Sequence, residues 1–492
     1  MPLITAADWQ SVLPAFLVAA TSLVVLLVEF LGLSRRRPVG SAIALAGTAA
    51  AGIIAAQGYG PAVVTFGGAW IGGGFTVVFE EIVIVATLFS LMLLAYTERK
   101  EQFSGSCALM LLSATGAMLM TGAGNLMMIF LGLELLSLGL YCLCGLASRP
   151  TAREAAVKYL ILSSMASGFL LYGMALLFGA TGSVALSAIA QPGNTSPLYV
   201  LGVGLFLVGI GFKLSLVPFH VWAPDVYEGA PVATTAFMSV VTKVGTLAVL
   251  ARFTYAALPP DKSALLVPLW IIAGLSMLIG NLAALAQTDM KRLLAYSGVA
   301  QIGYIVAALA GSTAQGLRYA IFYLVAYTFM NLGAFAVVAL LGDDTQEATH
   351  LNAFAGLAAR RPLLAAAMTF FLLALAGLPP TAGFLGKMLI LSANTNVAAN
   401  LGMTYLWLSG LLLLGTAISL YVYFKIVRAM YAPLRTPAAV PAAPRSGVLP
   451  WIAIGLCFAG VIVMGFYPKT PSDILPSVGI AVRASSLSVP LR

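Results

Sequence analysis

Charged residues are scarce in this sequence. Of its 492 residues, 61% are hydrophobic and only 8% are Asp, Glu, Lys or Arg, whereas soluble domains carry roughly a quarter charged residues. A soluble fold of this composition would have no polar surface. The composition therefore excludes an ordinary soluble domain and predicts one all-α polytopic membrane domain over residues 1–492.

Cysteine and histidine are also rare, with four and two residues. The cysteines all lie in apolar segments, and the Cys142-x-Cys144 pair has no histidine or second cysteine pair nearby to complete a metal site. The short glycine patterns lack the strand-to-helix context of a phosphate cradle. Nothing resembles a nucleotide, flavin, haem or iron–sulfur site, and we expect no cofactor or metal on this chain.

Long apolar segments dominate the chain. A spanning helix needs about 20 apolar residues, and the sequence predicts about fourteen such spans. The N-terminal segment is too long for a signal peptide and lacks a basic leading end, so it is predicted to be a retained span. The predicted spans are 12–33, 39–57, 76–97, 105–122, 125–147, 155–180, 198–222, 231–257, 265–287, 293–311, 317–341, 363–395, 405–431 and 449–467.

The net charge of +9 could suggest a nucleic-acid partner, but the cations cluster in short loops. These loops follow odd-numbered spans, so the positive-inside rule makes them cytoplasmic and predicts both termini on the periplasmic side. The even-to-odd connections hold few cations, chiefly Lys262. The loop cations are Arg35, Arg36, Arg37, Arg99, Lys100, Arg149, Arg153, Lys291, Arg292, Arg360, Arg361, Arg428, Arg435 and Arg445.

The middle of the chain looks duplicated. After spans 1–3 (residues 1–104), residues 105–257 and 265–431 each contain five predicted spans, and span 14 (449–467) follows. Because five is odd, the two repeats must be inverted relative to each other. The fourth span of each is interrupted by proline, in LSLVPFHVWAP and LALAGLPPTAGFLGK. Paired broken helices in inverted repeats point to an ion or substrate pathway.

Four ionisable residues lie well inside predicted spans, namely Glu134, Lys213, Lys243 and Lys387. A charged side chain near the bilayer centre costs about 2.5 to 3.5 kcal/mol on insertion scales. The alternatives are structural ion pairs facing the interior or a proton-transfer chain. Three lysines against one glutamate leave unpaired cations, which favours proton transfer.

Lysine suits a proton-transfer role because burial favours its neutral amine, while a nearby carboxylate favours the charged form. A movement of Glu134 relative to Lys213 would therefore load or release a proton. His220 lies at the first helix break. It is either a proton relay or a hydrogen-bonded helix-end residue.

Other acidic residues lie nearer the ends of predicted spans. Glu29 lies near the cytoplasmic end of span 1, and Glu80 and Glu81 lie at the start of span 3. All three are therefore expected at solvated helix ends. Glu154 and Lys158 are four residues apart and can pair on one helix face. The alternative for this pair is proton uptake from the cytoplasm.

The turns contain three further candidates. Asp225 and Glu228 follow span 7 and could cap span 8 or contact a neighbour. His350 lies in a polar loop and is expected to be solvated.

Several long motifs resemble the proton-translocating antiporter-like subunits of respiratory complex I, and the resemblance covers nearly the whole chain. Lys387 stands where one sister subunit has glutamate, and the chain stops after span 14 without a long lateral helix. By these two features the chain is most similar to the subunit N family of bacterial NADH-quinone oxidoreductase. The motifs are GLELLSLGLY, FKLSLVPFHVWAPDVYEGAP, VVTKVG, AQTDMKRLLAYSGVAQIGY and LAGLPPTAGFLGK.

The resemblance implies that Glu134 and Lys213 form a tuning charge pair, that Lys243 is the central relay and that Lys387 opens to the periplasmic side. His220 matches a histidine of the family's central hydrophilic axis. One departure is Gly298 in AYSG, where relatives often have a second serine. It puts one hydroxyl or water contact in doubt.

The resemblance also implies a multi-pass protein of the bacterial inner membrane with no redox chemistry of its own. NADH, FMN, iron–sulfur clusters and quinone would be bound by other subunits, and sister antiporter-like subunits would be neighbours. The alternative is a subunit of a multisubunit sodium/proton antiporter or a membrane-bound hydrogenase, and a third possibility is a passive scaffold. A sodium site would need several oxygen ligands at a helix break, so buried lysines favour protons.

Overall fold

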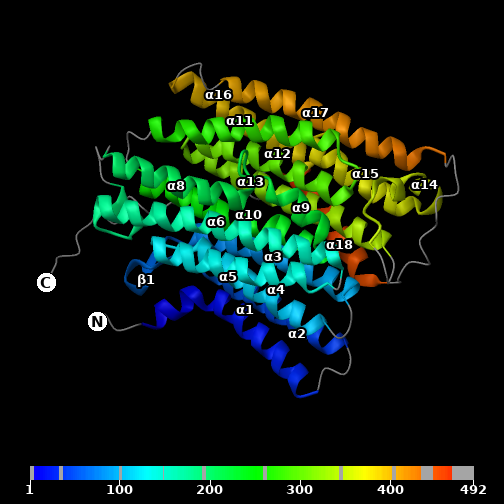
Figure 1. Ribbon diagram of the computed structural model, residues 1–492, viewed down its shortest axis with the longest axis horizontal. Coiled ribbons are helices and arrows are strands. Elements are labelled where there is room, and N and C mark those ends of the chain that lie inside the picture. Colours follow the sequence, from blue (N-terminus) through cyan, green and yellow to red (C-terminus); the bar gives the residue numbers. More distant parts are fainter. Residues whose placement is uncertain are drawn as a thin grey trace.

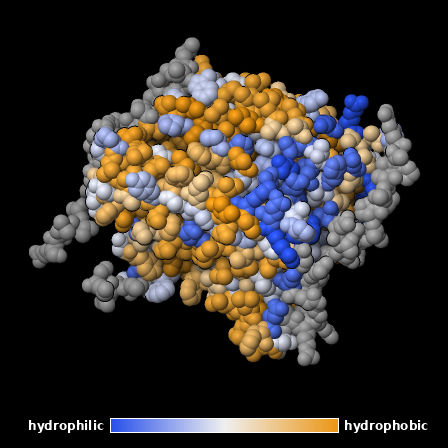
Figure 2. Space-filling model, in the orientation of Figure 1, coloured by the Kyte–Doolittle hydropathy of each residue, from blue (hydrophilic) through white to orange (hydrophobic). Residues whose placement is uncertain are grey.

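The fold is an all-helical bundle with one short hairpin. The computed structural model describes residues 5–32, 37–98, 102–147, 149–190, 196–258, 263–342, 347–401, 406–433 and 447–467. Its long helices lie side by side with their axes nearly aligned (Figure 1). Apolar side chains cover most of the face seen in Figure 2, as expected for a surface that meets lipid.

The α-helices are α1 (Ala6–Phe30), α2 (Arg37–Gln57), α3 (Gly74–Thr97), α4 (Phe103–Thr121), α5 (Leu126–Gly145), α6 (Pro150–Thr181), α7 (Leu186–Ile189), α8 (Pro197–Leu214), α9 (Trp222–Gly229), α10 (Val232–Arg252), α11 (Ser263–Leu285), α12 (Met290–Ala310), α13 (Ala314–Leu341), α14 (Leu357–Arg360), α15 (Pro362–Ala376), α16 (Ala382–Leu401), α17 (Leu406–Tyr431) and α18 (Val448–Phe466). The remaining elements are β1 (Val63–Thr65), η1 (Phe66–Gly68), β2 (Trp70–Gly72), η2 (Phe253–Ala257) and η3 (Leu351–Phe354).

The prediction of an all-α polytopic fold is confirmed. Within the described residues, 13 helices are long and apolar enough to cross a membrane, and α15 is a shorter apolar helix. The predicted span 363–395 consists of α15 and α16, so the thirteen continuous helices and this broken one account for the predicted fourteen. The loop cations Arg35, Arg36, Arg99, Lys100, Lys262, Arg435 and Arg445 lie outside the described residues.

Both predicted helix breaks are present. Helix α8 ends at Leu214, and Ser215 follows with a φ of 58° before the chain turns into α9. Helix α15 ends at Ala376, and Gly377 follows with a φ of 87° before α16. Proline lacks the backbone donor that a continuous helix needs, so each break leaves carbonyl groups free for other partners.

The order of the helices across the bundle shows which of them lie at its edges and which lie inside. Helices α1 and α2 form one edge, α16 and α17 lie near the other, and α18 returns to pack against α3 and α13 (Figure 1). Helix α10 is fully buried along its apolar window, and α12 and α13 are nearly so. The buried polar residues of α10 and α12 are therefore inside the protein.

Contacts between helices follow the same pattern in the two predicted repeats. In the first, α4 packs on α5, α5 on α6, α6 on α8 and α4 on α10. In the second, α11 packs on α12, α12 on α13, α13 on α15 and α11 on α17. This agreement is what a duplication requires, while the repeat boundaries at 105–257 and 265–431 stay a prediction.

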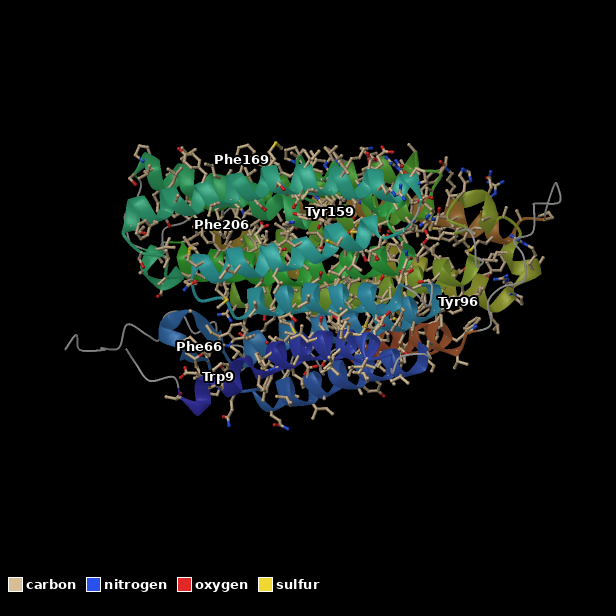
Figure 3. The ribbon with its side chains drawn as sticks, turned by 60° about the horizontal axis from the view of Figure 1, so that its bottom comes forward. Trp9, Phe66, Tyr96, Tyr159, Phe169 and Phe206 are labelled. Atoms are coloured by element: carbon tan, nitrogen blue, oxygen red, sulfur yellow. The ribbon has the colours of Figure 1, made fainter. Side chains whose placement is uncertain are left out.

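A small hairpin covers one end of the bundle. Strands β1 and β2 pair antiparallel, and the Trp9 ring of α1 lies 6.1 Å from the Phe66 ring at the tip (Figure 3). Trp70 is fully buried there, against Gly122 at the end of α4. Buried Arg252 donates hydrogen bonds to the Ile71 carbonyl and to Thr76, which ties α10 to this end.

Helices α4 and α5 approach closely through glycines. A Cβ on Gly116 would lie 2.4 Å from the Leu136 backbone nitrogen and 2.6 Å from the Gly132 carbonyl oxygen. Both contacts are with backbone, which cannot move aside as a flexible side chain can. Small residues of this kind let membrane helices pack at short distance.

Replacing Gly116 with Leu should therefore force α4 and α5 apart. Overpacking of this kind costs about 1–3 kcal/mol or more, so the melting temperature of the purified protein should fall. Gly105→Leu in the same helix is the matched control, because a Cβ there has no neighbour within 4 Å. Equal melting temperatures for the two variants would contradict this packing.

Candidate functional site

Three buried lysines lie in the interior of the bundle. Lys213 in α8, Lys243 in α10 and Lys387 in α16 are 2%, 1% and 4% exposed. Among the described residues, none of the three forms an ion pair with a carboxylate. Each ammonium group is instead held by neutral acceptors and aromatic rings, so each is a candidate for gaining and losing a proton.

Lys213 is held between α5 and α6. Its Nζ donates to Ser137 Oγ at 2.7 Å and to Ser163 Oγ at 2.5 Å. It also lies 5.3 Å from the centre of the Tyr159 ring, inside the distance at which an aromatic face attracts a cation. Figure 3 shows Tyr159 in the interior of the bundle. These neutral partners stabilise a charged lysine less than a carboxylate would.

Glu134 lies close to Lys213 without touching it. Its carboxylate accepts a hydrogen bond from Ser167 at 2.5 Å. Along α5, Glu134 precedes Ser137 by three residues, and along α6, Ser167 follows Ser163 by four. The carboxylate and the ammonium are therefore about one helical turn apart on the same pair of helices.

Lys243 meets an aromatic hydroxyl. Its Nζ donates to the Tyr227 hydroxyl oxygen at 3.2 Å. Across from it, a Cβ on Gly298 would lie 3.4 Å from this Nζ and 3.0 Å from the Tyr327 hydroxyl oxygen. The glycine of AYSG thus lies directly beside the central lysine. A serine at position 298 would reach both groups. The contact that Gly298 lacks is therefore one with Lys243 and Tyr327.

Lys387 lies at the second helix break. Its Nζ donates to the carbonyl oxygens of Leu375 at 3.1 Å and Ala376 at 2.9 Å, the last residues of α15. A cation at a helix C-terminus is stabilised by the carbonyl groups and the helix dipole. Although Lys387 follows Pro379 and Pro380 in the sequence, its ammonium group points back to the helix before them.

Polar side chains of α12 lie between Gly298, which is beside Lys243, and the Leu375 carbonyl that Lys387 contacts. Gln301 donates to the same Leu375 carbonyl that Lys387 uses, at 3.0 Å, and accepts from the Tyr323 hydroxyl at 2.5 Å. One turn earlier, Ser297 and Tyr423 share a hydrogen bond of 2.5 Å. Gln301 was not singled out from the sequence, although it lies in the quoted motif. A glutamine in a spanning helix was the available signal.

The connection between Lys213 and Lys243 is more aromatic. The Trp222 ring stacks on Tyr159 at 4.7 Å and lies edge-on to Tyr227 at 6.2 Å. Its Nε1 donates to the Phe212 carbonyl, which also accepts from the Ser215 backbone nitrogen at the break. The hydroxyl of Tyr159 is buried without a hydrogen-bond partner in the described part of the chain.

His220 lies at the break, as predicted, but to one side of the lysines. It is partly exposed, and its ring is 6.1 Å from that of Tyr296. Its Nδ1 has no hydrogen-bond partner among the residues that the structure describes. The relay role of His220 stays a prediction.

A cluster of charged residues lies at the end of the bundle where α9 is found. Arg292 donates to Asp225 at 2.6 Å and to Glu228 at 2.8 Å, and Lys158 contacts Asp225 at 3.1 Å. The predicted Glu154–Lys158 pair is confirmed at 2.8 Å. Asp225 and Glu228 thus contact neighbouring helices rather than capping α10. Figure 2 shows this end as a hydrophilic patch.

Hydrogen bonds to two cations outweigh burial at Asp225. Partial burial alone would raise the pKa of its carboxyl, but the Arg292 and Lys158 hydrogen bonds hold that pKa below its ordinary value. Asp225 is therefore a stable anion at neutral pH.

Glu347 is the second anion of this charged end. It accepts from buried Lys291 at 2.8 Å and from the Val232 backbone nitrogen at 2.9 Å, and Arg149 lies 3.3 Å away. Burial alone would raise the pKa of Glu347, but Lys291 and Arg149 hold it below its ordinary value. Glu347, not Asp225, stabilises the start of α10.

The expectations for the remaining residues had mixed outcomes. Glu29 is exposed, as predicted. His350 is also exposed, and its Nδ1 accepts from the Asn352 backbone nitrogen. The prediction for Glu80 was wrong: it is 1% exposed in the interior of α3, and Glu81 beside it is only partly exposed. Helix α3 begins at Gly74, so these two residues lie about two turns into it.

The chain is similar to known membrane-complex subunits. A family model described as NADH:quinone oxidoreductase/Mrp antiporter, TM, matches residues 123–412. NADH-quinone oxidoreductase subunit N 1 of Symbiobacterium thermophilum is 40% identical over 417 residues, which cover 82% of this chain and 83% of that protein.

Two solved structures share the fold. A chain of respiratory complex I from Thermus thermophilus has a TM-score of 0.79 and 33% identity, covering 94% of this chain and 98% of that one. A chain of an archaeal membrane-bound sulfane sulfur reductase has a TM-score of 0.85 and 26% identity, covering 97% and 98%.

The contacts of Glu347 generate a pH-dependent prediction. Because its pKa is held below the unfolded value of about 4.3, its contribution to stability is complete above that pH and is lost as the pH falls through the folded pKa. Glu347→Gln should cost about 1–3 kcal/mol at pH 7 and lower the melting temperature.

The difference in melting temperature between wild type and Glu347→Gln should stay constant from about pH 7 to about pH 4.5 and shrink at lower pH, as the pH falls through the folded pKa. Glu154→Gln is the control, since its ion pair is mostly exposed and contributes little. A difference that stays constant at the lower pH as well would show that the charge of Glu347 is not the cause.

Proposed function

The chain belongs to the NADH:quinone oxidoreductase/Mrp antiporter transmembrane family, and from this membership we propose that it is the N-type, proton-translocating membrane subunit of an NADH-quinone oxidoreductase. The proposal extends the names of its relatives, such as the 40% identical subunit N 1, to this chain. In this role the chain moves protons, and electron transfer from NADH to quinone takes place in partner subunits.

One observation carries the proposal: three lysines that meet no carboxylate among the described residues are buried inside the bundle, and Gln301 of α12 shares the Leu375 carbonyl with one of them, Lys387. A structural network would pair each ammonium with a carboxylate, because an unpaired buried charge is costly. A proton path instead needs groups that can lose their charge. Neutral hydroxyl and carbonyl partners allow each lysine to do so.

Glu134 is the tuning group in this mechanism. When it approaches Lys213, the charged ammonium is stabilised, and when it withdraws, the neutral amine is favoured. Their separation of about one turn leaves Ser137 and Ser163 between them, so a small shift of α5 against α6 changes the interaction strongly. Lys213 then passes a proton toward Lys243.

Lys243 is the central relay and Lys387 the exit group. The contacts of Gln301 with the Leu375 carbonyl and Tyr323 provide the polar connection between them. His220 is assigned a secondary relay role at the break. Each proton moved against a 100 mV potential costs about 2.3 kcal/mol, so the transfer must be coupled to a driving reaction.

The same proposal covers the membrane in which the chain lies, its orientation and its partner subunits. It lies in the bacterial inner membrane, its charged end faces the cytoplasm and both termini face the periplasm. NADH, FMN, iron–sulfur clusters and quinone are bound by partner subunits, and sister antiporter-like subunits are among its neighbours. Residues 105–257 and 265–431 are the two inverted repeats, and each contributes one half-pathway through its broken helix.

The alternative is a subunit of a sodium/proton antiporter or a related membrane complex, which the family description and the sulfane sulfur reductase fold leave available. Sodium binding would need several oxygen ligands at a helix break. At the second break the Lys387 ammonium already contacts the Leu375 and Ala376 carbonyls, and Lys213 lies in the last turn before the first break. The positive charge of a lysine repels a cation. This favours protons over sodium.

Replacing Lys213 or Glu134 with Ala should abolish proton pumping, and with it coupled quinone reduction, while the complex still assembles. The measurement is NADH-driven acidification of membrane vesicles, with turnover and assembly followed in parallel. Exposed Lys425, at the end of α17, offers the control Lys425→Ala. Normal pumping in either the Lys213 or the Glu134 variant would refute the mechanism.

A further inference from the structure

Two adjacent carboxyl groups in α3 lie outside the lysine path. Glu80 is 1% exposed, and Glu81 is partly exposed, within a helix that runs unbroken from Gly74 to Thr97. This helix belongs to neither of the proposed repeats. The mechanism above makes no use of either side chain.

The two side chains point to different neighbours. A Cβ on Gly52 of α2 would lie 3.5 Å from Glu81 Oε2, so Glu81 faces the outer edge of the bundle. Glu80 shares a helix face with Thr76, one turn earlier, and Thr76 accepts a hydrogen bond from Arg252 of α10 at 2.6 Å. Glu80 therefore faces the fully buried helix α10.

One oxygen of each carboxyl group lacks a partner in the described part of the chain. The Oε1 atoms of Glu80 and Glu81 are buried and accept no hydrogen bond there. Arg252, the cation on the same face, directs its donors to Thr121, Ile71 and Thr76 instead. An isolated buried carboxylate is so costly that such groups take up a proton.

The oxygen atoms available at this pair favour a proton over a metal ion as the ligand. Calcium and similar hard cations need about six to eight oxygen ligands, and backbone carbonyls supply many of them only where a helix is broken. Helix α3 is continuous, so its carbonyls are engaged, and two carboxyl groups alone make a poor metal site. A proton needs only one carboxyl oxygen.

We propose that Glu80 and Glu81 form a proton-binding site separate from the lysine path, which exchanges protons between the α2 edge of the bundle and buried helix α10. Glu81 is the member closer to the outer edge, and Glu80 holds its proton beside α10. Proton binding at this pair does not depend on the proposed pumping function. Its contribution to pumping does rest on that function.

The first test is labelling of the intact complex in native membranes with an apolar carbodiimide. The reagent takes the acid proton on its nitrogen while the carboxyl oxygen adds to its central carbon, and the adduct rearranges to a stable acylurea. Mass spectrometry of the α3 peptide should find the adduct on Glu81 at neutral pH, and less of it at alkaline pH. Solvent-exposed Glu29 should remain unlabelled.

The second test measures NADH-driven proton pumping in Glu80→Gln and Glu81→Gln, which keep the side-chain volume but cannot carry an acid proton. Each should lower pumping severalfold relative to wild type, whereas Glu29→Gln should not. Glu80→Asp should retain part of the activity. If a glutamine variant fails to assemble, the labelling of the wild-type complex still decides whether the site binds a proton.

An unlabelled Glu81 at neutral pH would overturn the site, and labelling accompanied by full pumping in both glutamine variants would overturn its contribution to pumping. The two proposals fail in distinguishable ways. If Lys213→Ala abolishes pumping and both glutamine variants pump normally, only the contribution of the α3 pair to pumping is wrong. If Glu81 is labelled but Lys213→Ala pumps normally, the lysine mechanism fails and proton binding in α3 stands.

Discussion

The burial of positive charge without a negative partner governs this structure. Lys213, Lys243 and Lys387 are each at most 4% exposed, and in the described part of the chain none meets a carboxylate. A lysine paired with a carboxylate would stay charged, whereas a charged lysine with no polar partner at all would be too costly to bury. Hydroxyls, carbonyls and aromatic rings provide the intermediate stabilisation that lets a lysine be charged at one moment and neutral at another.

The two helix breaks supply part of that stabilisation. The break after α15 frees the carbonyls of Leu375 and Ala376 for Lys387. At the break after α8, the Phe212 carbonyl accepts from both the Ser215 backbone nitrogen and Trp222 Nε1. Backbone that is irregular at membrane depth is tolerated where protein surrounds it. The same irregularity that interrupts each helix therefore provides the acceptors in the interior.

Sequence patterns were sufficient for the features that depend on local chemistry. Apolar segment length predicted the spans, proline predicted both breaks, and the rarity of lysine in such segments marked Lys213, Lys243 and Lys387. They were insufficient where distant segments meet. Glu347 reaches α10 from a loop more than a hundred residues away, a contact that no spacing encodes. Glu80 was misplaced because its burial depends on the packing of α3 against α2, α4 and α10, which span spacing does not reveal.

The central claim is that protons pass between Lys243 and Lys387 along α12, and Gln301 is its most direct test. The measurement is the number of protons pumped per NADH oxidised in Gln301→Leu, with Gln315→Leu at the start of α13 as the matched control. The account predicts a large fall in this ratio for Gln301→Leu alone, because the link from Tyr323 to the Leu375 carbonyl is lost. An unchanged ratio in an assembled complex would contradict it.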